Sequence, residues 1–307
     1  MMKLSRRTAL MAVALAAAAG PTLGQATYPD KPVTFIVPFA AGSATDQLAR
    51  ALGQHITEQT KQAVVVDNKA GASGMLAAQQ AARAPADGYT VLITTNTTHA
   101  ANEHLYKKLP YHPVKDFQPI TGLGKGGQVM VVNTASPYQT VAEVVAAAKK
   151  NPGKVTFGSG SSSSRVAGEL FQQMAGVQVL HVPYKSNPLA ITDLLGGQID
   201  FMITDTSTGV PQIKGGKLRA LGVSTTKRLP MLPDVPTIDE AGVKGYDMGY
   251  WFAAYVPAGT KTPAAKAFFD TSGGEPFVTT PEELAQFQVA EATKWGKVIK
   301  AAGIEAE

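Results

Sequence analysis

Cysteine is absent from this 307-residue chain, and histidine and tryptophan are scarce, with five and two residues. Without cysteine there can be no disulfide bond, no thiol nucleophile and no zinc ribbon. Only 17% of the residues are charged, whereas 44% are hydrophobic. A chain of this length and composition buries a core without covalent staples, and its length predicts two domains.

Apolar runs long enough to cross a bilayer are also missing. The longest covers the eleven residues Ala9–Ala19, and a spanning helix needs about 20. Basic residues precede this run, and Gly24-Gln25-Ala26 after it has the small residues of a cleavage site. Residues 1–26 are therefore predicted to be an export signal, with the Sec and twin-arginine routes both open because of Arg6-Arg7. A membrane-anchoring helix is the alternative. We expect a soluble protein of the periplasm.

The excess of positive charge belongs largely to this signal. The whole chain has 28 basic and 23 acidic residues, a net charge of +5. Lys3, Arg6 and Arg7 would leave with the signal, and the remaining 25 basic residues would exceed the 23 acidic ones by only two. The composition therefore gives no reason to expect a nucleic-acid partner.

Short apolar runs alternate with amphipathic stretches along the chain, which predicts an α/β fold with mainly parallel sheets. The first series has strands at 33–37, 63–66 and 89–94 and helices at 44–58 and 75–83. The second has strands at 129–132, 155–157, 179–182, 199–203 and 218–223 and helices at 141–149 and 163–174. A proline-rich crossing at 229–236, an aromatic strand at 248–256 and a long helix at 281–302 follow.

Two such series suggest two lobes around one cleft. We expect residues 27–125 with 229–307 to form the first domain and residues 126–228 the second. Ligands of open α/β sheets bind beyond the carboxyl ends of the strands, so loops from both lobes would meet in the cleft. Closure of two lobes around a small molecule is a common use of this geometry.

Two strand-to-helix junctions have the residues of an anion site. Pro38 to Asp46 joins the first strand to a helix, with Gly42 permitting a tight turn and Ser43 or Thr45 as the cap. Phe157 to Arg165 is rich in serine and ends in an arginine. Free amides at a helix start bind anions, and arginine can pair with a carboxylate through two hydrogen bonds. An ordinary capped turn and a flexible linker are the alternatives.

Other motifs are incomplete. Gly122 to Gly127 has dinucleotide-binding spacing, but a strand follows it where a helix is needed. Ser224-Thr225-Thr226-Lys227 lacks the companion motifs of a β-lactamase. His99, Glu103 and His104 do not form a zinc motif, and a solvated helix face is the simpler interpretation. We therefore expect no metal and no cofactor. Asp205, after an apolar strand, could orient a ligand amine or cap a turn.

The mature chain resembles the Bug family, the extracytoplasmic receptors of tripartite tricarboxylate transporters. The resemblance runs through nearly the whole mature chain and rests on seven segments spread along it: Tyr28 to Val33, Val37 to Gly42, Ala84 to Tyr89, His181 to Lys185, Asp193 to Asp200, Leu232 to Thr237 and Trp295 to Ile299. It implies a two-lobed periplasmic binding protein of type II, of the Venus flytrap kind, expected here as a monomer.

The resemblance also implies the binding residues. In the family the loop after the first strand takes one ligand carboxylate, and the serine-rich helix start of the second domain faces it. Three aromatic side chains could flank an aromatic ring, which makes a terephthalate-like diacid a candidate ligand. The residues expected in the cleft are Phe39, Ala41, Gly42, Ser43, Thr45, Asp46, Asn96, Thr97, Ser159, Ser161, Ser163, Arg165, Tyr184, Asp205 and Trp251.

This chain departs from the family pattern in three places. Arg165 stands where the family often has histidine, which predicts direct pairing with a carboxylate whatever the pH. Ser186-Asn187-Pro188 replaces a glycine-rich turn and is expected to reshape the pocket wall. After Thr260 the family usually has an extra helix, whereas here Pro263 runs almost directly into Ala267. Either the chain has a deletion or a stretch is missing from the sequence.

These features predict a receptor, not an enzyme. It would capture a small carboxylate, foremost a dicarboxylate, by lobe closure and deliver it to the membrane permease of a tripartite tricarboxylate transporter. The rival interpretation is an exported serine hydrolase acting on carboxylic esters, with a nucleophile among Ser161 to Ser164 and His181 as the base.

Overall fold

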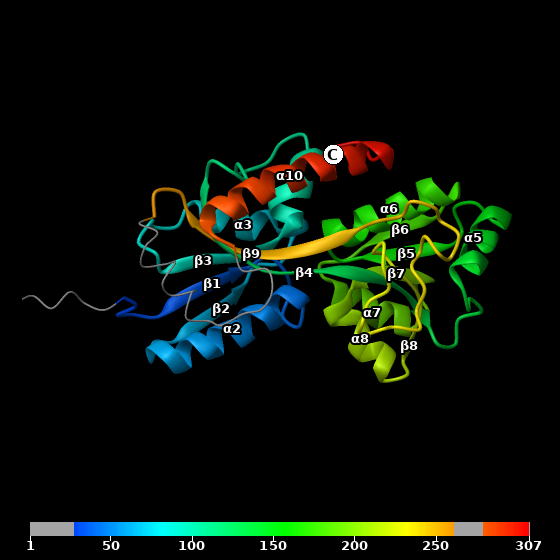
Figure 1. The fold of residues 1–307 in the computed structure, drawn as a ribbon, viewed down its shortest axis with the longest axis horizontal. Coiled ribbons are helices and arrows are strands. Elements are labelled where there is room, and N and C mark those ends of the chain that lie inside the picture. Colours follow the sequence, from blue (N-terminus) through cyan, green and yellow to red (C-terminus); the bar gives the residue numbers. More distant parts are fainter. Residues whose placement is uncertain (1–27, 261–278, 307) are drawn as a thin grey trace, which may run out of the picture.

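The computed structural model describes residues 28–260 and 279–306. The expected export signal at 1–26 and the shortened segment around Pro263 lie outside the described residues. Two lobes stand side by side, and two long strands, β4 (Phe117–Asn133) and β9 (Gly249–Pro257), run between them (Figure 1). The expected α/β fold of two lobes built from sheets with flanking helices is therefore confirmed.

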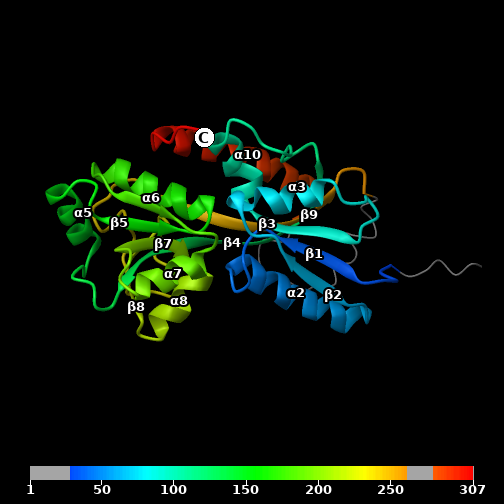
Figure 2. The same cartoon turned by 180° about the vertical axis from the view of Figure 1, so that it is seen from behind.

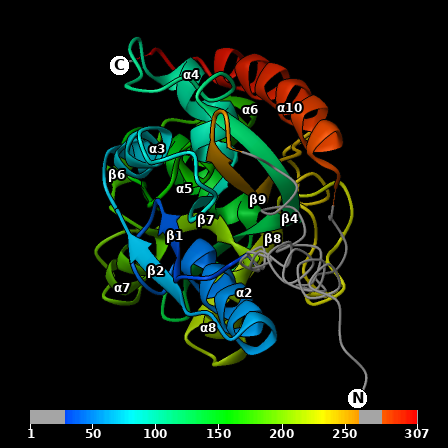
Figure 3. The same cartoon turned by 90° about the vertical axis from the view of Figure 1, so that its left-hand side faces the viewer.

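The first lobe is built on a parallel arrangement of β2, β1 and β3, with β9 antiparallel to β3. Apolar side chains at every position of β1 except Thr34 are buried because helices cover both faces of the sheet. In the side view, α3 and α10 lie above the sheet and α2 below it (Figure 3). The elements are β1 (Val33–Val37), α2 (Ala44–Thr60), β2 (Val64–Asn68), η1 (Ala72–Gly74), α3 (Met75–Ala82), β3 (Thr90–Thr95), η2 (Thr97–Ala101), α4 (Asn102–Leu105) and α10 (Pro281–Ala301).

The second lobe continues from β4 in the order β4, β7, β5, β6, with β8 on the other side of β4. Strands β5, β6 and β7 are parallel to one another, and β4 is antiparallel to β7 and β8. The elements are α5 (Val141–Lys150), β5 (Thr156–Ser159), α6 (Ser162–Ala175), β6 (Leu180–Pro183), α7 (Asn187–Leu195), β7 (Phe201–Asp205), α8 (Thr206–Lys214) and β8 (Leu218–Val223).

Strand β4 is much longer than the predicted strand at 129–132. It pairs with β9 from Phe117 to Gly127 and with β7 and β8 beyond that point. The glycine-rich stretch Gly122 to Gly127 therefore lies inside a strand, not at a helix start. The glycines hid this part of the strand from the sequence, but β9 supplies a pairing partner from Phe117 to Gly127. One strand thus joins the two lobes.

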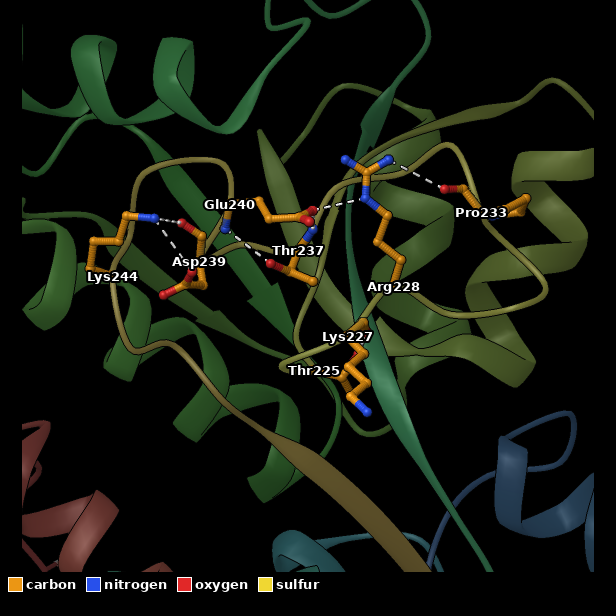
Figure 4. Close-up of polar contacts among 8 residues, drawn as sticks. All are labelled: Thr225, Lys227, Arg228, Pro233, Thr237, Asp239, Glu240 and Lys244. Atoms are coloured by element: carbon orange, nitrogen blue, oxygen red, sulfur yellow. Dashed lines mark hydrogen bonds and ion pairs between the residues drawn. The ribbon is translucent and has the colours of Figure 1, made fainter.

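The proline-rich crossing lacks helix and strand from Leu229 to Pro236, as predicted. The expected domain boundary at residue 229 assigns this segment to the first domain, but the segment packs on the second lobe. Leu232 is buried with Val129 and Val131 of the second lobe, and the Val223 amide donates to Pro236 O at 2.9 Å. Arg228 Nε and the Thr237 amide both donate to Glu240 Oε2, at 2.9 and 2.8 Å, which ties the segment to itself (Figure 4).

The following turn is anchored on the second lobe as well. The Tyr246 hydroxyl donates to Ala167 O of α6 at 2.8 Å, and Tyr246 is fully buried. Residues 229–248 therefore pack with the second lobe, and the chain returns to the first lobe only at β9. A proline-rich segment has no periodicity that would indicate which lobe it covers, so this assignment needed the tertiary structure.

Helix α10 lies over the junction of the lobes and touches α6 as well as α4 (Figures 1 and 2). It begins with a capping box of Thr280 and Glu283. Its buried residues Leu284, Trp295 and Ile299 belong to a core cluster with members in both lobes. Within the described ranges, no helix has the length and apolar character needed to cross a membrane.

Candidate functional site

Two helix starts, one from each lobe, face a common pocket between the lobes. We call this space the inner pocket. In this structure its cavity volume is about 20 Å³, room for about one water. It is lined by Phe39, Ser43, Ala44, Thr45, Thr95, Gly160, Ser161, Ser163, Asn187, Asp205, Tyr250 and Phe252.

The first lobe contributes the start of α2. Ser43 caps the helix by accepting from the Asp46 amide at 3.2 Å, which leaves the amides of Ala44 and Thr45 without intrahelical partners. Both residues line the inner pocket. The preceding turn depends on Gly42, whose φ of +81° lies in the left-handed region. The start of this 17-residue helix therefore offers amide donors and the positive end of its dipole.

Asp46 holds this loop and does not reach the ligand space. Its Oδ2 accepts from the Gly42 amide at 2.8 Å and from Arg50 Nε at 3.0 Å, and its Oδ1 accepts from Asn68 Nδ2 at 3.0 Å. These donors lower the pKa of the carboxyl, against the opposing effect of burial. The expected ligand contact of Asp46 is therefore replaced by a positioning role.

The second lobe contributes the start of α6. Ser161 is the cap and accepts from the Ser164 amide at 3.2 Å, so the amides of Ser162 and Ser163 lack intrahelical partners. Ser163 lines the inner pocket, and its hydroxyl lies 3.1 Å from that of Ser161. The expected serine-rich helix start is therefore present, and it faces the start of α2 across the inner pocket.

Helices α7 and α8 begin beside α6. Asn187, the first residue of α7, accepts from the Gly160 amide at 2.9 Å through Oδ1 and donates to Asp205 Oδ2 at 2.9 Å through Nδ2. Asp205 occupies the cap position of α8 but makes no side-chain capping bond. Burial raises the pKa of its carboxyl to about 6, although the bond from Asn187 opposes this.

A second, wider pocket adjoins the inner one and shares Phe39, Gly160 and Ser161 with it. We call it the outer pocket. Unlike the inner pocket, it is lined by basic side chains, Arg165, His181 and Lys185. Its other lining residues are Gly71, Ala72, Ser73, Gly74, Tyr106, Ser159, Ser162, Pro183 and Tyr184. The Tyr184 hydroxyl donates to Asp193 Oδ2 at 2.8 Å.

A buried hydrogen bond crosses between the lobes beside these pockets. Ser162 Oγ at the start of α6 donates to Asn102 Oδ1 of α4 at 2.9 Å, and both residues are buried. Asn102 is itself held by its Nδ2, which donates to Ser73 O at 2.9 Å. The two lobes are thus in polar contact next to the ligand space.

The serines named in the hydrolase alternative are used in other ways. Ser161 caps α6, and Ser164 Oγ donates to Ile203 O. His181 Nε2 instead lies 2.7 Å from Ser159 Oγ, on the strand before the helix. The contact given for the His181 Nε2 atom is therefore with a serine outside Ser161 to Ser164.

Several expected residues line neither pocket. Ala41 and Gly42 are exposed on the loop. Asn96 and Thr97 are fully buried, and Asn96 Oδ1 accepts from the Trp251 amide at 3.3 Å. The neighbouring Thr95 lines the inner pocket instead. Trp251 is a core residue, 1% exposed and packed against Phe287 with ring centroids 5.5 Å apart.

Residues that sequence reasoning missed come from three sources. Tyr250 and Phe252 flank Trp251 on the aromatic strand. The sequence predicted this strand but placed Trp251 in the cleft, whereas its two neighbours line the inner pocket. Asn187 stands in the turn that departs from the family pattern, which was the available signal. Residues 71–74, at the short helical turn η1, and Tyr106, directly after α4, belong to no motif, and only the fold brings them to the cleft.

His99 is buried, whereas the sequence predicted that it would lie on a solvated helix face. It is 0% exposed and stacks on Tyr255 at a centroid distance of 4.0 Å. Burial lowers the pKa of its imidazole to about 3. Glu103, in contrast, is exposed. The described parts of the chain contain no group of three acidic, histidine or cysteine side chains that could hold a metal ion.

Curated sequences similar to this chain span its whole fold. A UPF0065 protein from the tcbD-tcbE intergenic region of Pseudomonas sp. (strain P51) is 34% identical, with 96% of this chain and 94% of the relative aligned. BugT of Bordetella pertussis is 31% identical, with 98% and 99% aligned.

Several solved structures have a fold similar to that of this chain. Rpa4515 of R. palustris, solved with adipate, has a TM-score of 0.88 at 34% identity and covers 91% of this chain and 100% of its own. MatC of Rhodopseudomonas palustris, solved with bound malate, has a TM-score of 0.83 at 28% identity, with 89% and 100% covered. The periplasmic binding protein BugD has a TM-score of 0.85 at 32% identity, with 91% and 100% covered.

The family profile that matches is that of the tripartite tricarboxylate transporter family receptor, over residues 48–304. Members of this family are solute-binding receptors and not enzymes, which removes the hydrolase alternative. With two lobes, an interlobe pocket and this profile over most of its length, the chain belongs to the tripartite tricarboxylate transporter receptor family, the Bug family.

Proposed function

We propose that this protein is an exported receptor that captures a small dicarboxylate between its lobes and delivers it to the permease of a tripartite tricarboxylate transporter. The observation that carries this proposal is the convergence of two capped helix starts, α2 and α6, on one pocket. Each helix start behaves like about half a positive charge. A carboxylate between them would bind both lobes at once.

The chemistry of the two pockets supports a ligand with two acidic ends. Burying a carboxylate costs several kcal/mol unless donors replace its water. The inner pocket supplies amides and the hydroxyls of Ser43, Thr45 and Ser163. The outer pocket supplies Arg165 and Lys185. One carboxylate in each pocket would use both sets of donors.

The relatives solved with adipate and malate support a dicarboxylate, since each of those ligands has two carboxylates. Phe39 lines both pockets and Tyr184 lines the outer one, so an aromatic diacid such as terephthalate belongs among the candidates. We propose that the first lobe, with α10, and the second lobe, which includes residues 229–248, close around the ligand. A dianion held by both lobes would favour the closed state.

A thermal-shift screen against mono-, di- and tricarboxylates tests the proposal. A ligand at about 100 times its dissociation constant stabilises the folded protein by about 2.7 kcal/mol, which raises the melting temperature by a few degrees in a protein of this size. Dicarboxylates, terephthalate included, are expected to give the largest shifts. A screen in which no carboxylate raises the melting temperature would contradict the proposal.

Arg165→Ala tests the outer pocket. A hydrogen bond to a charged group contributes about 1.5–3 kcal/mol, so the substitution is expected to weaken dicarboxylate binding about tenfold or more. Arg83→Ala is the matched control, because Arg83 is exposed at the end of α3. Equal dicarboxylate affinity in the two variants would remove Arg165 from the site.

A further inference from the structure

The turn before α3 has a strained backbone. Gly71, Ala72, Ser73 and Gly74 follow one another with φ angles of +136°, +46°, +49° and +79°. The left-handed region is open to glycine but costs free energy in other residues. Among the described residues, the one further non-glycine residue with a positive φ is Lys61, at a helix C-cap, where this conformation is common. The turn therefore needs contacts with the rest of the molecule to hold it.

This turn forms one wall of the outer pocket. We call residues 71–74 the lip. The end of the lip is wedged against the first lobe, because a Cβ at Gly74 would lie 2.8 Å from Pro38 Cβ and 2.9 Å from Thr98 Cγ2. The strained residues Ala72 and Ser73 precede this wedge, and Ala72 is exposed. Packing therefore fixes the end of the lip, and polar contacts must fix its middle.

Ser73, in the middle of the lip, has two such contacts. Its hydroxyl lies 2.8 Å from the Tyr106 hydroxyl, and its carbonyl accepts from Asn102 Nδ2 at 2.9 Å. The Asn102 amide is itself oriented by the second lobe, because Ser162 Oγ donates to its Oδ1 at 2.9 Å. A side-chain amide whose oxygen is held on one side presents its N–H groups on the other. The second lobe therefore reaches the lip through Asn102, which is fully buried.

We infer that the second lobe holds the lip in its strained conformation through Ser162 and Asn102, and that separation of the lobes releases it. When Ser162 moves away, the Asn102 amide loses the bond that orients it, and Ser73 O loses a fixed donor. The backbone of Ala72 and Ser73 can then leave the left-handed region, which moves this wall of the outer pocket. The inference goes beyond the proposed receptor function, and the free protein tests it without any ligand.

Hydrogen exchange of the free protein measures how firmly the lip is held. The Gly74 amide donates to Gly71 O at 2.9 Å, and the Met75 amide donates to Ala72 O. Both bonds lie within the turn, so the exchange rates of these two amides report its local opening. In the wild-type protein we expect both amides to be protected, because the contacts of Ser73 keep the turn closed.

Ser162→Ala removes the bond from the second lobe to Asn102. One hydrogen bond of ordinary strength changes an equilibrium constant about fivefold, so the lip amides should exchange about fivefold faster in this variant. Exchange in β3 should not change. Ser136→Ala is the matched control, because it removes another second-lobe hydroxyl, one that accepts from the Tyr138 amide. Unchanged exchange in the lip, or an equal acceleration in β3, would overturn the inference.

Ala72→Gly tests the part that strain plays. Because Ala72 is exposed, the substitution removes little packing, and glycine adopts the left-handed conformation at lower cost. In this background the lip should stay in place without help from the second lobe, so that adding Ser162→Ala accelerates exchange about twofold or less. Thermal unfolding shows that the variants are folded. A fivefold acceleration in both backgrounds would show that strain does not drive release of the lip, and the inference would be wrong.

Discussion

Asn187 Nδ2 donates to Asp205 Oδ2 at 2.9 Å, and the two residues begin different helices of the second lobe. The same asparagine accepts from the Gly160 amide before α6. One side chain therefore fixes the relative positions of three helix starts at the pocket. Four consequences of this arrangement and of the neighbouring contacts can be measured.

Asp205→Asn should stabilise the free protein at neutral pH. The carboxyl pKa is about 6 in the folded protein, above its value of about 3.9 in an unfolded chain. The folded state therefore binds more protons between these values, and the wild-type protein loses stability as the pH rises from about 4 to about 6. The loss amounts to at most about 3 kcal/mol. The Asp205→Asn variant has no carboxyl to ionise at this position and therefore does not lose this stability.

Urea unfolding at pH 4 and pH 7.5 measures this effect. We expect the variant to exceed the wild type in free energy of unfolding at pH 7.5 by up to about 3 kcal/mol and to match it more closely at pH 4. Asp234→Asn, at an exposed position, is the matched control for the substitution and should change the free energy of unfolding by no more than about 0.5 kcal/mol. An Asp205→Asn difference that is the same at both pH values would show that the carboxyl is not perturbed.

His99 should make the protein sensitive to acid. Its pKa is about 3 in the folded state, against about 6.5 unfolded. The unfolded chain binds the proton first, so stability that is present above pH 6.5 is lost as the pH falls toward 3. Between pH 7 and pH 4 this amounts to about 3 kcal/mol.

His99→Phe tests the sign, because phenylalanine can pack on Tyr255 without binding a proton. Relative to the wild type, the free energy of unfolding of the variant should improve by about 3 kcal/mol between pH 7 and pH 4. His55→Phe, at a half-buried position on α2, is the matched control for the substitution. Parallel curves for wild type and His99→Phe would mean that His99 does not cause the acid sensitivity.

Ser162→Ala should weaken ligand binding without removing a residue of the inner pocket. The change deletes the bond to Asn102 that joins the lobes, and one such bond contributes about 1 kcal/mol. Since the bond crosses the cleft, its loss should favour separation of the lobes and raise the dissociation constant of a dicarboxylate about fivefold. Calorimetry measures this change.

Small-angle scattering of the free protein provides the structural readout for the same variant. A larger radius of gyration in Ser162→Ala than in wild type is expected, and the two values should converge when ligand saturates both proteins. Unchanged affinity together with an unchanged radius would show that the bond does not hold the lobes together.

Gly160→Ala should disturb the pocket through α7. A Cβ at residue 160 would lie 1.9 Å from the carbonyl carbon of Ser186 and 2.1 Å from the Asn187 nitrogen. Backbone must move to accept it, at a cost of about 1–3 kcal/mol or more. Because the shift displaces Asn187, dicarboxylate affinity should fall as well.

Gly124→Ala is the matched control for this substitution. In strand β4 the nearest atom to a new Cβ at residue 124 is a side-chain carbon of Phe252 at 3.9 Å, an ordinary contact. Thermal unfolding and calorimetry of both variants should separate them clearly. A Gly160→Ala protein as stable as Gly124→Ala and equally able to bind dicarboxylates would contradict the close approach of these loops.

The sequence predicted the individual elements well where the local pattern was complete. Strand β8 was placed at residues 218–223, as observed, and most other elements lay within two residues of their predicted ends. Helices α7 and α8 were missed because each is only nine residues long and contains a proline. In α7 the proline stands at the first turn, where a helix tolerates it.

The candidate site divides in the same way. Ser161 and Ser163 follow a strand and open a helix, and this local chemistry was readable without a structure. The role of Asp46 could not be predicted from the sequence, because a carboxylate at a helix start can face a ligand or hold its own loop in place. Only the positions of Gly42, Arg50 and Asn68 show that it does the latter.

By itself, the sequence determined the α/β class, the pairing of strands with capped helices and the family, since these depend on local periodicity and on motifs spread along the chain. The tertiary structure decided which side chains meet. It placed Asn187 against Asp205, turned Trp251 into the core while Tyr250 and Phe252 faced the cleft, and packed residues 229–248 on the second lobe. Contacts between distant segments follow from how the sheets and helices pack, and no local pattern encodes that geometry.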